Sequence, residues 1–348
     1  MRRMTKVVNV GNVKIGGNEK ISIQSMLNAP SYDVEGNVEQ ALKLKKVGCD
    51  IIRVAIPDIE SVNLILKIKE KVDVPLVADI HFDYKLALES IAAGVDKIRI
   101  NPGNIGDEDK IKAVVKACKL KNVPIRIGVN SGSLEKEILK KYEHPTAQAL
   151  CESALYHASL LEKFDFDDIV LSMKSSDVKT MVDAYTMVAE RCSYPLHLGV
   201  TETGTQKLGV IKSAVGIGSL LLKGIGDTFR VSLTGDVEDE VECGKNILRS
   251  CGLYKGGIEI ISCPTCGRTR IDIIDLVKRA EKELSRFDKN LKVAIMGCAV
   301  NGPGEAREAD LGIAGGDGYG ILFKKGKVLR KVKETDLLDE LIFEIEKL

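Results

Sequence analysis

The sequence predicts an α/β protein in which a (β/α)8 TIM barrel is followed by a smaller α+β domain. Between residue 21 and about residue 250, eight short apolar segments alternate with amphipathic stretches, which is the order of a parallel sheet whose strands are joined by helices. After Cys251 this alternation stops and shorter, mixed elements follow. Eight such units indicate a closed barrel, with an open doubly wound sheet as the alternative.

The expected barrel strands are short and rich in Ile, Val and Leu; they are residues 21–26, 50–56, 75–81, 97–101, 124–130, 168–174, 195–201 and 228–234. Helical spacing separates them, most clearly at 38–47, 59–72, 107–121 and 179–191. Three joins, VGCDIIRV, AGVDKIRI and KGIGDTFR, carry Gly where a helix C-cap is expected. Because neither GxGxxG after the first strand nor GxxxxGK[ST] occurs, a nucleotide-binding sheet is disfavoured.

A second domain is expected after a linker at 254–257. Its expected elements are a strand at 258–262, a helix at 272–286, a strand at 292–296, a hairpin at 311–331 and a helix at 335–347. We therefore expect a barrel domain at 1–253 that binds the substrate and a domain at 254–348 that carries a cofactor.

Charge and composition exclude several classes of protein. The 51 Lys and Arg residues are balanced by 50 Asp and Glu, no basic run exceeds a few residues, and aromatic residues are only 4% with no Trp. A nucleic-acid-binding protein is therefore not expected, because it would need a basic surface and stacking side chains. No apolar run approaches the roughly 18 residues of a membrane span and no secretory signal is evident, so we expect a cytoplasmic protein.

Each expected barrel strand carries polar residues on one face, because side chains alternate along a strand. The apolar face is expected to meet the surrounding helices, which leaves the polar face inside the barrel. The polar face comprises Arg53, Asp79, His81, Arg99, Asn101, Arg126, Asn130, Ser172, Lys174, His197, Thr201, Arg230, Ser232 and Thr234.

Five of these side chains are cations, and Asp79 is the one acid among them. Burying an unpaired cation is costly, and too few inward acids are available for internal salt bridges, which are the alternative interpretation. We therefore expect an anion pocket at the C-terminal ends of the strands, and the number of cations favours a diphosphate. Asp79, His81, His197 and Glu202 are candidate acid–base groups or else structural hydrogen-bonding residues, and His144 and His157 are interpreted as ordinary.

Three cysteines in the second domain indicate a metal centre: Cys263 and Cys266 form a CxxC motif, and Cys298 lies in a Gly/Pro-rich loop. A redox disulfide is disfavoured without a thioredoxin-like βαβ unit, and structural zinc usually takes four Cys or His ligands, whereas all four His precede residue 200. An iron–sulfur cluster is left; since it normally takes four thiolates, Glu305 in the same loop is the expected fourth ligand. The remaining cysteines are interpreted as core residues: Cys49, Cys118, Cys151, Cys192, Cys243 and Cys251.

Together these motifs resemble those of the 4-hydroxy-3-methylbut-2-enyl diphosphate synthase family. The matching segments cover nearly the whole chain: KIRINPGNIG (97–106), PIRIGVNSGS (124–133), LSMKSS (171–176), HLGVTETG (197–204), FRVSLTGD (229–236), CPTCGR (263–268) and GCAVNGPGEA (297–306). The chain is similar to the two-domain bacterial form, because it has no room for the domain that larger relatives insert.

The resemblance implies reductive ring opening of 2-C-methyl-D-erythritol 2,4-cyclodiphosphate to (E)-4-hydroxy-3-methylbut-2-enyl diphosphate, with loss of a hydroxyl as water, in isoprenoid biosynthesis. It implies a [4Fe-4S] cluster held by Cys263, Cys266, Cys298 and Glu305. It implies diphosphate contacts from Arg99, Asn101, Arg126, Asn130, Lys174, Arg230 and Ser232. Glu305 is also expected to be catalytic, because a carboxylate ligand exchanges more readily than a thiolate, and Glu202 is the expected proton donor.

The expected electron donor is ferredoxin or flavodoxin, both acidic proteins, although the sequence shows no obvious basic patch for either. The eighth barrel helix should return to the end opposite the pocket, so a short linker near Tyr254 makes it hard for the second domain to reach its own barrel's pocket. We therefore expect a head-to-tail homodimer in which one subunit's cluster covers the other's barrel, as the resemblance also implies.

Two other functions remain open on the residues alone. A barrel lyase or aldolase with a structural zinc, acting on a sugar phosphate, would need a Schiff-base lysine or a metal base in the pocket, and Lys174 could serve as the lysine. A non-enzymatic iron–sulfur sensor would leave five inward cations without a purpose. The iron and zinc content of anaerobically purified protein discriminates between these functions.

Overall fold

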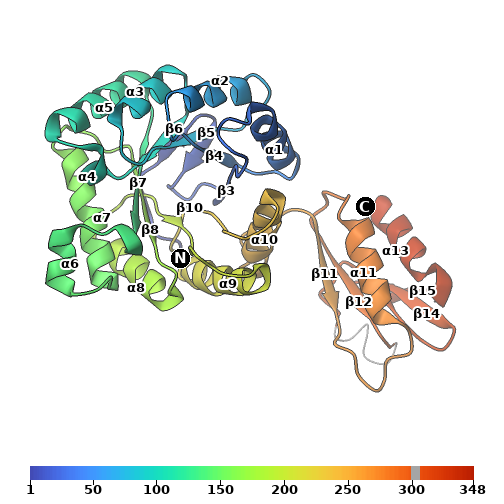
Figure 1. Ribbon diagram of the computed structural model, residues 1–348. Helices are drawn as coiled ribbons and strands as arrows, with labels where there is room; N and C mark the ends of the chain where they lie inside the picture. Colours follow the sequence, from blue (N-terminus) through green and yellow to red (C-terminus); the bar gives the residue numbers. More distant parts are fainter. Residues whose placement is uncertain (299–305) are drawn as a thin grey trace. The chain divides into compact units, whose positions relative to one another are not determined.

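The computed structural model describes residues 1–298 and 306–348 of the chain. Contacts divide it into two compact units, Met1–Leu253 and Tyr254–Leu348, each with its own sheet (Figure 1). Within the described residues, no helix is both long enough and apolar enough to cross a membrane.

Eight parallel strands form the sheet of the first unit. The strands β3 (Ser22–Met26), β4 (Ile51–Ala55), β5 (Leu76–Asp79), β6 (Lys97–Ile100), β7 (Ile125–Asn130) and β8 (Ile169–Lys174) pair in chain order, and β10 (Thr228–Phe229) pairs with both β3 and β9 (His197–Leu198). A bridge between Leu171 and Leu196 joins β8 to β9 and closes the ring. The expected (β/α)8 barrel is thus confirmed.

The last two strands are shorter than the sequence predicted, because regular pairing covers only two residues in each instead of 195–201 and 228–234. A Cβ on Gly199 would lie 3.1 Å from the carbonyl oxygen of Arg230, and Thr203 donates to the carbonyl oxygen of Ser232 at 2.7 Å. A side-chain bond thus takes the place of ladder bonds and leaves both strand ends as loops at the barrel mouth.

Helices surround the barrel (Figure 1). They are α1 (Val34–Lys46), α2 (Asn63–Lys69), α3 (Tyr84–Ala92), α5 (Glu108–Lys121), α7 (Ala147–Glu162), α8 (Val178–Ala189), α9 (Gln206–Leu222) and α10 (Val237–Ser250). Most begin at an Asp or Thr whose side chain accepts a hydrogen bond from a backbone N–H of the first turn, namely Asp33, Asp83, Asp107, Thr146, Asp177 and Thr205. These caps anchor the loops that follow the C-terminal ends of the strands.

An N-terminal hairpin packs at the opposite end of the barrel. Its strands β1 (Val8–Val10) and β2 (Val13–Ile15) pair antiparallel. One buried cluster joins Val8, Val10 and Ile15 of the hairpin to Ile51, Val77 and Val170 of the barrel. Since Ile51 and Val77 lie two residues before Arg53 and Asp79, the inward face changes from apolar at the hairpin to polar toward the mouth.

The second unit is a five-stranded sheet with the order β11 (Ile258–Ser262), β12 (Leu291–Met296), β13 (Leu311–Ala314), β14 (Tyr319–Lys324) and β15 (Lys327–Lys333). The first three strands are parallel and the last two pair antiparallel. The single hairpin expected at 311–331 is three strands, because the chain bends at Asp317 and Gly318, where Gly318 has a φ of 69°. A Cβ on Gly315 would lie 2.7 Å from Ile271, so only glycine fits there.

Each face of this sheet has its own core. The helix face packs against α11 (Ile273–Leu284) and α13 (Leu337–Glu346) through residues such as Val293, Ile313 and Leu322. The opposite face, here called the loop face, packs Met296 and Phe323 against Ala306 and Ala309. Cys263 contacts both cores, at the end of β11.

Candidate active site

A cavity of about 530 Å³ opens at the C-terminal ends of the barrel strands, which is where barrel enzymes carry their sites. Every barrel strand, or the loop directly after it, contributes to its wall. The lining residues are Met26, Arg53, Asp79, His81, Arg99, Arg126, Gly128, Asn130, Ser131, Gly132, Ser172, Lys174, Thr201, Glu202, Arg230 and Ser232. The alternation of side chains along the strands therefore located most of this wall.

Three of the expected residues lie beside the cavity. Asn101 accepts a hydrogen bond from Gly103 N–H at 3.3 Å and so caps the short helix α4 (Pro102–Ile105). Thr234 donates to the carbonyl oxygen of Gly204 at 3.4 Å. The fully buried His197 has its Nδ1 3.4 Å from Thr228 Oγ1. These three support the loops and the floor of the site.

Asp79 is the central acid of the cavity. Its carboxylate lies 3.2 Å from Arg99 Nη1, 3.5 Å from His81 Nε2 and 3.8 Å from Arg53 Nε. Burial alone would raise the pKa of Asp79, but the charge of Arg53, the His81 hydrogen bond and the charge of Arg99 outweigh it and hold that pKa below its usual range. Asp79 is therefore an ionised anchor for two arginines.

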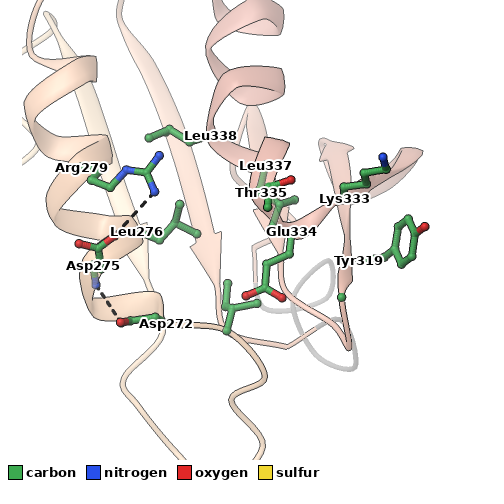
Figure 2. Close-up of a pocket in the computed structure, with 12 residues that line it drawn as sticks. Asp272, Asp275, Leu276, Arg279, Tyr319, Lys333, Glu334, Thr335, Leu337 and Leu338 are labelled. Carbon is green, nitrogen blue, oxygen red and sulfur yellow. Dashed lines mark hydrogen bonds and ion pairs between the residues drawn. The ribbon is translucent and has the colours of Figure 1, made fainter.

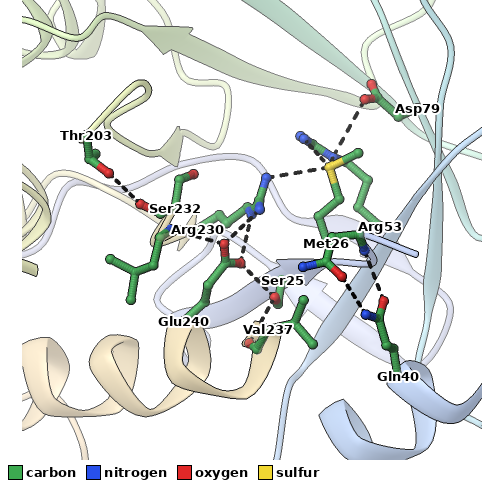
Figure 3. A network of polar contacts seen from close by, with 12 residues as sticks. Ser25, Met26, Gln40, Arg53, Asp79, Thr203, Arg230, Ser232, Val237 and Glu240 are labelled. Atoms are coloured by element: carbon green, nitrogen blue, oxygen red, sulfur yellow. Dashed lines mark hydrogen bonds and ion pairs between the residues drawn. The ribbon is translucent and has the colours of Figure 1, made fainter. Parts of the chain in front are cut away.

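A second acid comes from outside the strands. Glu240 of α10 is buried and binds Arg230 through two hydrogen bonds, of 2.8 Å to Nη2 and 3.0 Å to Nε (Figure 3). It also accepts from Ser25 at 2.7 Å and from Leu233 N–H at 3.2 Å. Glu240 was not among the residues predicted from the sequence, although its position between the apolar Val237 and Val241 of an amphipathic helix indicates that it faces inward.

The remaining cations are less well compensated. Arg126 Nε and Nη2 and Lys97 Nζ are buried without a hydrogen-bond partner among the residues that the structure describes. Burial, with the charge of neighbouring arginines, holds the pKa of Lys97, Arg126 and Lys174 well below their usual values. Lys97 shares the parity of Arg99, so the same alternation could have found it. The interior of the barrel thus holds more positive charge than its own acids neutralise.

The thioether sulfur of Met26 contacts the guanidinium groups of two arginines in the cavity. Met26 Sδ lies 2.6 Å from Arg53 Nη2, 3.0 Å from Arg53 Nε and 3.5 Å from Arg230 Nη1 (Figure 3). Thioether sulfur is a weak acceptor, so an anionic oxygen would be the stronger partner for both guanidinium groups. Burial lowers the pKa of Arg53 to about 10 although Asp79 opposes the shift.

Glycine lets a third arginine cross the cavity. A Cβ on Gly128 would lie 2.3 Å from Arg99 Nε, and Arg99 Nη2 donates to the Gly128 carbonyl oxygen at 3.0 Å. Any side chain at this position would displace the guanidinium. At the mouth, Glu202 adopts a left-handed backbone conformation with φ of 52°, which is uncommon for a residue other than glycine and recurs at functional sites.

A buried histidine joins the two loops that carry Asn101 and Asn130. His157 of α7 accepts from Gly103 N–H at 3.3 Å through Nδ1, and its Nε2 bonds Glu135. Glu135 precedes α6 (Lys136–Tyr142) and also accepts from Ser153 at 2.8 Å. Because Nδ1 accepts, the proton is assigned to Nε2. His157 was expected to be an ordinary residue, but its two hydrogen bonds bridge two loops of the site.

The cysteines of the two units differ in environment. Burial raises the pKa of each of the six barrel cysteines, for example Cys49 to about 12 and Cys243 to about 11. In the second unit, hydrogen bonds from Arg268 lower the pKa of the exposed Cys266, and Gly297 N–H donates to Cys263 Sγ at 3.2 Å. The contacts with Arg268 favour the thiolate of Cys266, the form that iron–sulfur ligation requires.

The structure describes three of the four expected cluster ligands. Cys298 is half-buried after β12, whereas Glu305 lies outside the described residues. Within the described ranges, no group of three His, Cys, Asp or Glu side chains is gathered closely enough to hold a metal ion.

Known proteins resemble this chain over its full length. The family described as the GcpE TIM-barrel domain matches residues 5–245, and the GcpE protein C-terminal domain matches residues 259–347. The 4-hydroxy-3-methylbut-2-en-1-yl diphosphate synthase (flavodoxin) of Clostridium perfringens is 59% identical over 345 residues, which cover 99% of each chain. The protein of the same name from Fusobacterium nucleatum is 59% identical over 98% of this chain and 96% of its own.

Solved structures of dihydropteroate synthases share the barrel. The enzyme of Stenotrophomonas maltophilia has a TM-score of 0.52 at 14% identity over 71% of this chain and 98% of its own. A sulfonamide drug complex of the Yersinia pestis enzyme has a TM-score of 0.51 at 11% identity over 72% of this chain and 100% of its own. At such low identity the likeness shows the fold alone.

Because two nitrogens of Arg126 have no partner among the described residues, we expect this residue to lower the stability of the empty protein and to favour anion binding. Because Arg126→Met removes an uncompensated buried charge, the empty protein should gain about 1–3 kcal/mol in its free energy of unfolding. Inorganic pyrophosphate should raise the thermal midpoint of the wild type and leave that of the variant unchanged. Arg126→Lys, which keeps the charge, is the control. A less stable Met variant that pyrophosphate still stabilises would contradict the assignment.

His197 predicts a pH dependence of stability. Burial and the charge of Arg126 hold the pKa of His197 well below 6.5, so below about pH 6.5 the unfolded chain binds a proton that the folded chain does not. This contribution to stability is therefore lost as the pH falls, at about 1.4 kcal/mol per pH unit. Urea unfolding between about pH 7 and pH 5.5 should show a shallower slope for His197→Gln than for the wild type. Equal slopes would refute the effect.

The His157 bridge predicts a loss of affinity from outside the cavity wall. His157→Phe keeps a ring but leaves Gly103 N–H and Glu135 without this partner, so the two loops should hold their ligands less firmly. Affinity for inorganic pyrophosphate, measured by calorimetry, should fall by about tenfold, equivalent to about 1.4 kcal/mol. Ser153→Ala, which removes only the other partner of Glu135, should have a smaller effect. Similar losses in the two variants would show that the bridge does not act through Gly103.

Proposed function

This chain belongs to the GcpE family, and from that premise we propose that it is an iron–sulfur oxidoreductase of isoprenoid biosynthesis. Its reaction is the reductive ring opening of 2-C-methyl-D-erythritol 2,4-cyclodiphosphate to (E)-4-hydroxy-3-methylbut-2-enyl diphosphate. The observation that carries the proposal is the buried positive charge of Arg126 and Lys174 in the cavity wall, which a diphosphate neutralises. Two nitrogens of Arg126 have no hydrogen-bond partner among the described residues. Sequence identity of 59% to two 4-hydroxy-3-methylbut-2-en-1-yl diphosphate synthases, over 98% or more of this chain, supports the proposal.

The residues of the barrel bind and orient the substrate. Arg126 and Lys174 take the phosphoryl oxygens, and Arg53 and Arg230 turn from the Met26 thioether to the stronger anionic acceptors. Asp79, whose pKa is held low, and Glu240 together hold three of the guanidinium groups in position. Asn130, Ser172, Thr201 and Ser232 offer hydrogen bonds along the wall. The substrate is thus held in one register before electrons arrive.

Glu202 is our candidate for the group that delivers a proton to the departing hydroxyl. It lies at the mouth of the cavity, on the loop after β9, in a strained backbone conformation. The release of a hydroxyl as water needs one proton, and an exposed carboxyl exchanges protons readily with solvent.

We propose that Cys263, Cys266, Cys298 and Glu305 hold a [4Fe-4S] cluster. When bound, the cluster supplies electrons singly, from reduced flavodoxin or ferredoxin. The N–H donor to Cys263 and the lowered pKa of Cys266 support a thiolate site. Such free thiols require a reducing compartment, so we assign the protein to the cytoplasm.

We propose a head-to-tail homodimer, in which one subunit's cluster serves the other subunit's barrel. An exposed apolar face on α9 supports association: Ile211, Val215 and Leu222 are each more than half exposed. Monomeric proteins rarely leave such patches uncovered.

Mixing two inactive variants tests the reaction and the assembly together. Cys263→Ser removes a cluster ligand and Arg126→Ala removes a pocket cation, so each variant alone should be inactive with the cyclic diphosphate and dithionite-reduced methyl viologen. After subunit exchange, heterodimers should regain part of the wild-type activity, because one of their two sites combines an intact pocket with an intact cluster. Wild-type turnover is the control for the reaction. Verified exchange without recovery would sink the head-to-tail arrangement but not the reaction.

A further inference from the structure

Positive charge is segregated in the second unit as well as in the first. Between Asp317 and Glu334 the chain carries six cations and no acid, in a protein whose overall charge is +1. This stretch forms the β14–β15 hairpin at one edge of the sheet. The six cations are Lys324, Lys325, Lys327, Arg330, Lys331 and Lys333.

Register assigns two of these lysines to the loop face. Lys331 pairs with Ile321 and Lys333 with Tyr319, two and four residues before Phe323, which is part of the loop-face core with Cys263. Lys331 Nζ lies 4.7 Å from the centre of the Tyr319 ring, which agrees with a shared face. Figure 2 shows Tyr319 and Lys333 close together at the start of β14 and the end of β15.

These residues also lie at the cysteine end of the sheet. Strands β11, β12 and β13 are parallel, and Cys263 and Cys298 follow the ends of β11 and β12. Because β14 runs antiparallel to β13, its first residue, Tyr319, lies at that same end. Lys333, paired with Tyr319, therefore lies there too.

Among the described residues of the second unit, one of the six cations forms an ion pair. Arg330 lies on the helix face, where it bonds Glu340 and Glu344 of α13. The five lysines have no ion-pair partner within 4 Å in the portion of the chain that the structure covers. Tyr319 and Val328 are 47% and 56% exposed, so the lysines surround apolar surface, as at the centre and rim of a protein interface.

Edge-strand lysines also discourage sheet edges from pairing with one another, and β15 is an edge strand. That role needs charge of either sign. It gives no reason for the complete lack of acids or for exposed Tyr319 and Val328 between the lysines. A charge reversal separates the two explanations, because glutamate still protects an edge but repels an acidic partner.

We propose that the loop-face surface of the β14–β15 hairpin, formed by Tyr319, Val328, Lys331 and Lys333, is the docking site of an acidic one-electron flavoprotein. This inference rests on the proposed function, which needs two electrons delivered singly. The donor must dock and leave twice in each turnover, so a small complex steered by charge suits the task better than a tight one. No basic patch was evident in the sequence, because strand pairing in the folded hairpin is what brings Lys331 and Lys333 together on one face.

Charge reversal tests the surface directly. The variant Lys331→Glu/Lys333→Glu should bind an oxidised acidic flavodoxin at least about tenfold more weakly in calorimetry at low salt. The wild-type affinity should fall steeply as salt is raised, and the variant's should fall less. The matched control is Lys278→Glu/Lys282→Glu, which makes the same charge change on exposed residues of α11, on the helix face, and should bind as the wild type does.

Turnover separates failure of the docking site from failure of the proposed function. With flavodoxin as donor, the Lys331/Lys333 variant should be slow. With dithionite-reduced methyl viologen, a small cation that needs no lysine surface, it should match the wild type. Unchanged flavodoxin binding in this variant, or equal loss in the α11 control, would overturn the docking site. Wild-type protein without viologen-driven turnover would overturn the proposed function instead, while the binding result would stand on its own.

Discussion

Uncompensated positive charge inside a closed barrel is the constraint on which the rest of the first unit depends. Two acids, Asp79 from a strand and Glu240 from a helix, restrain three arginines, while Arg126 and Lys97 keep buried nitrogens unpaired in the described residues. An interior of this kind favours unfolding when empty. That cost is offset by the packing of the apolar outer strand faces, the capped helices and the N-terminal hairpin. The barrel therefore stays folded around its cationic cavity when no anion is bound.

Both units separate charge while the chain stays nearly neutral. In the barrel the cations face inward, toward a small ligand; in the second unit they face outward on one hairpin, toward the partner that we infer. In the second unit, Cys263 and Cys298 follow the ends of β11 and β12. The acids lie mainly on helices and loops elsewhere. The first unit therefore carries the cationic cavity, and the second carries the thiols that we propose as cluster ligands.

Much of this architecture could be predicted from sequence because strand periodicity is local. The recurrence of eight strand–helix units predicted the barrel, and alternation along each strand predicted most of the cavity wall. Alternation overestimated β9 and β10, where Gly199 and the Thr203 hydrogen bond end the pairing. It could not supply Glu240 or His157, because a helix brings each to the site from a distant part of the chain. Cys298 and Glu305 both stay predictions as cluster ligands. Cys298 is described by the structure, and Glu305 lies outside the described residues.

The hairpin of β1 and β2 has a consequence for the order of events. It covers the end of the barrel opposite the mouth, where its apolar residues pack against the strands. The linear product keeps both phosphates of its cyclic precursor, so the same cations hold it as firmly, and the hairpin blocks the far end of the barrel. We therefore expect departure of the product, rather than bond breaking, to limit how fast the site is cleared for the next molecule.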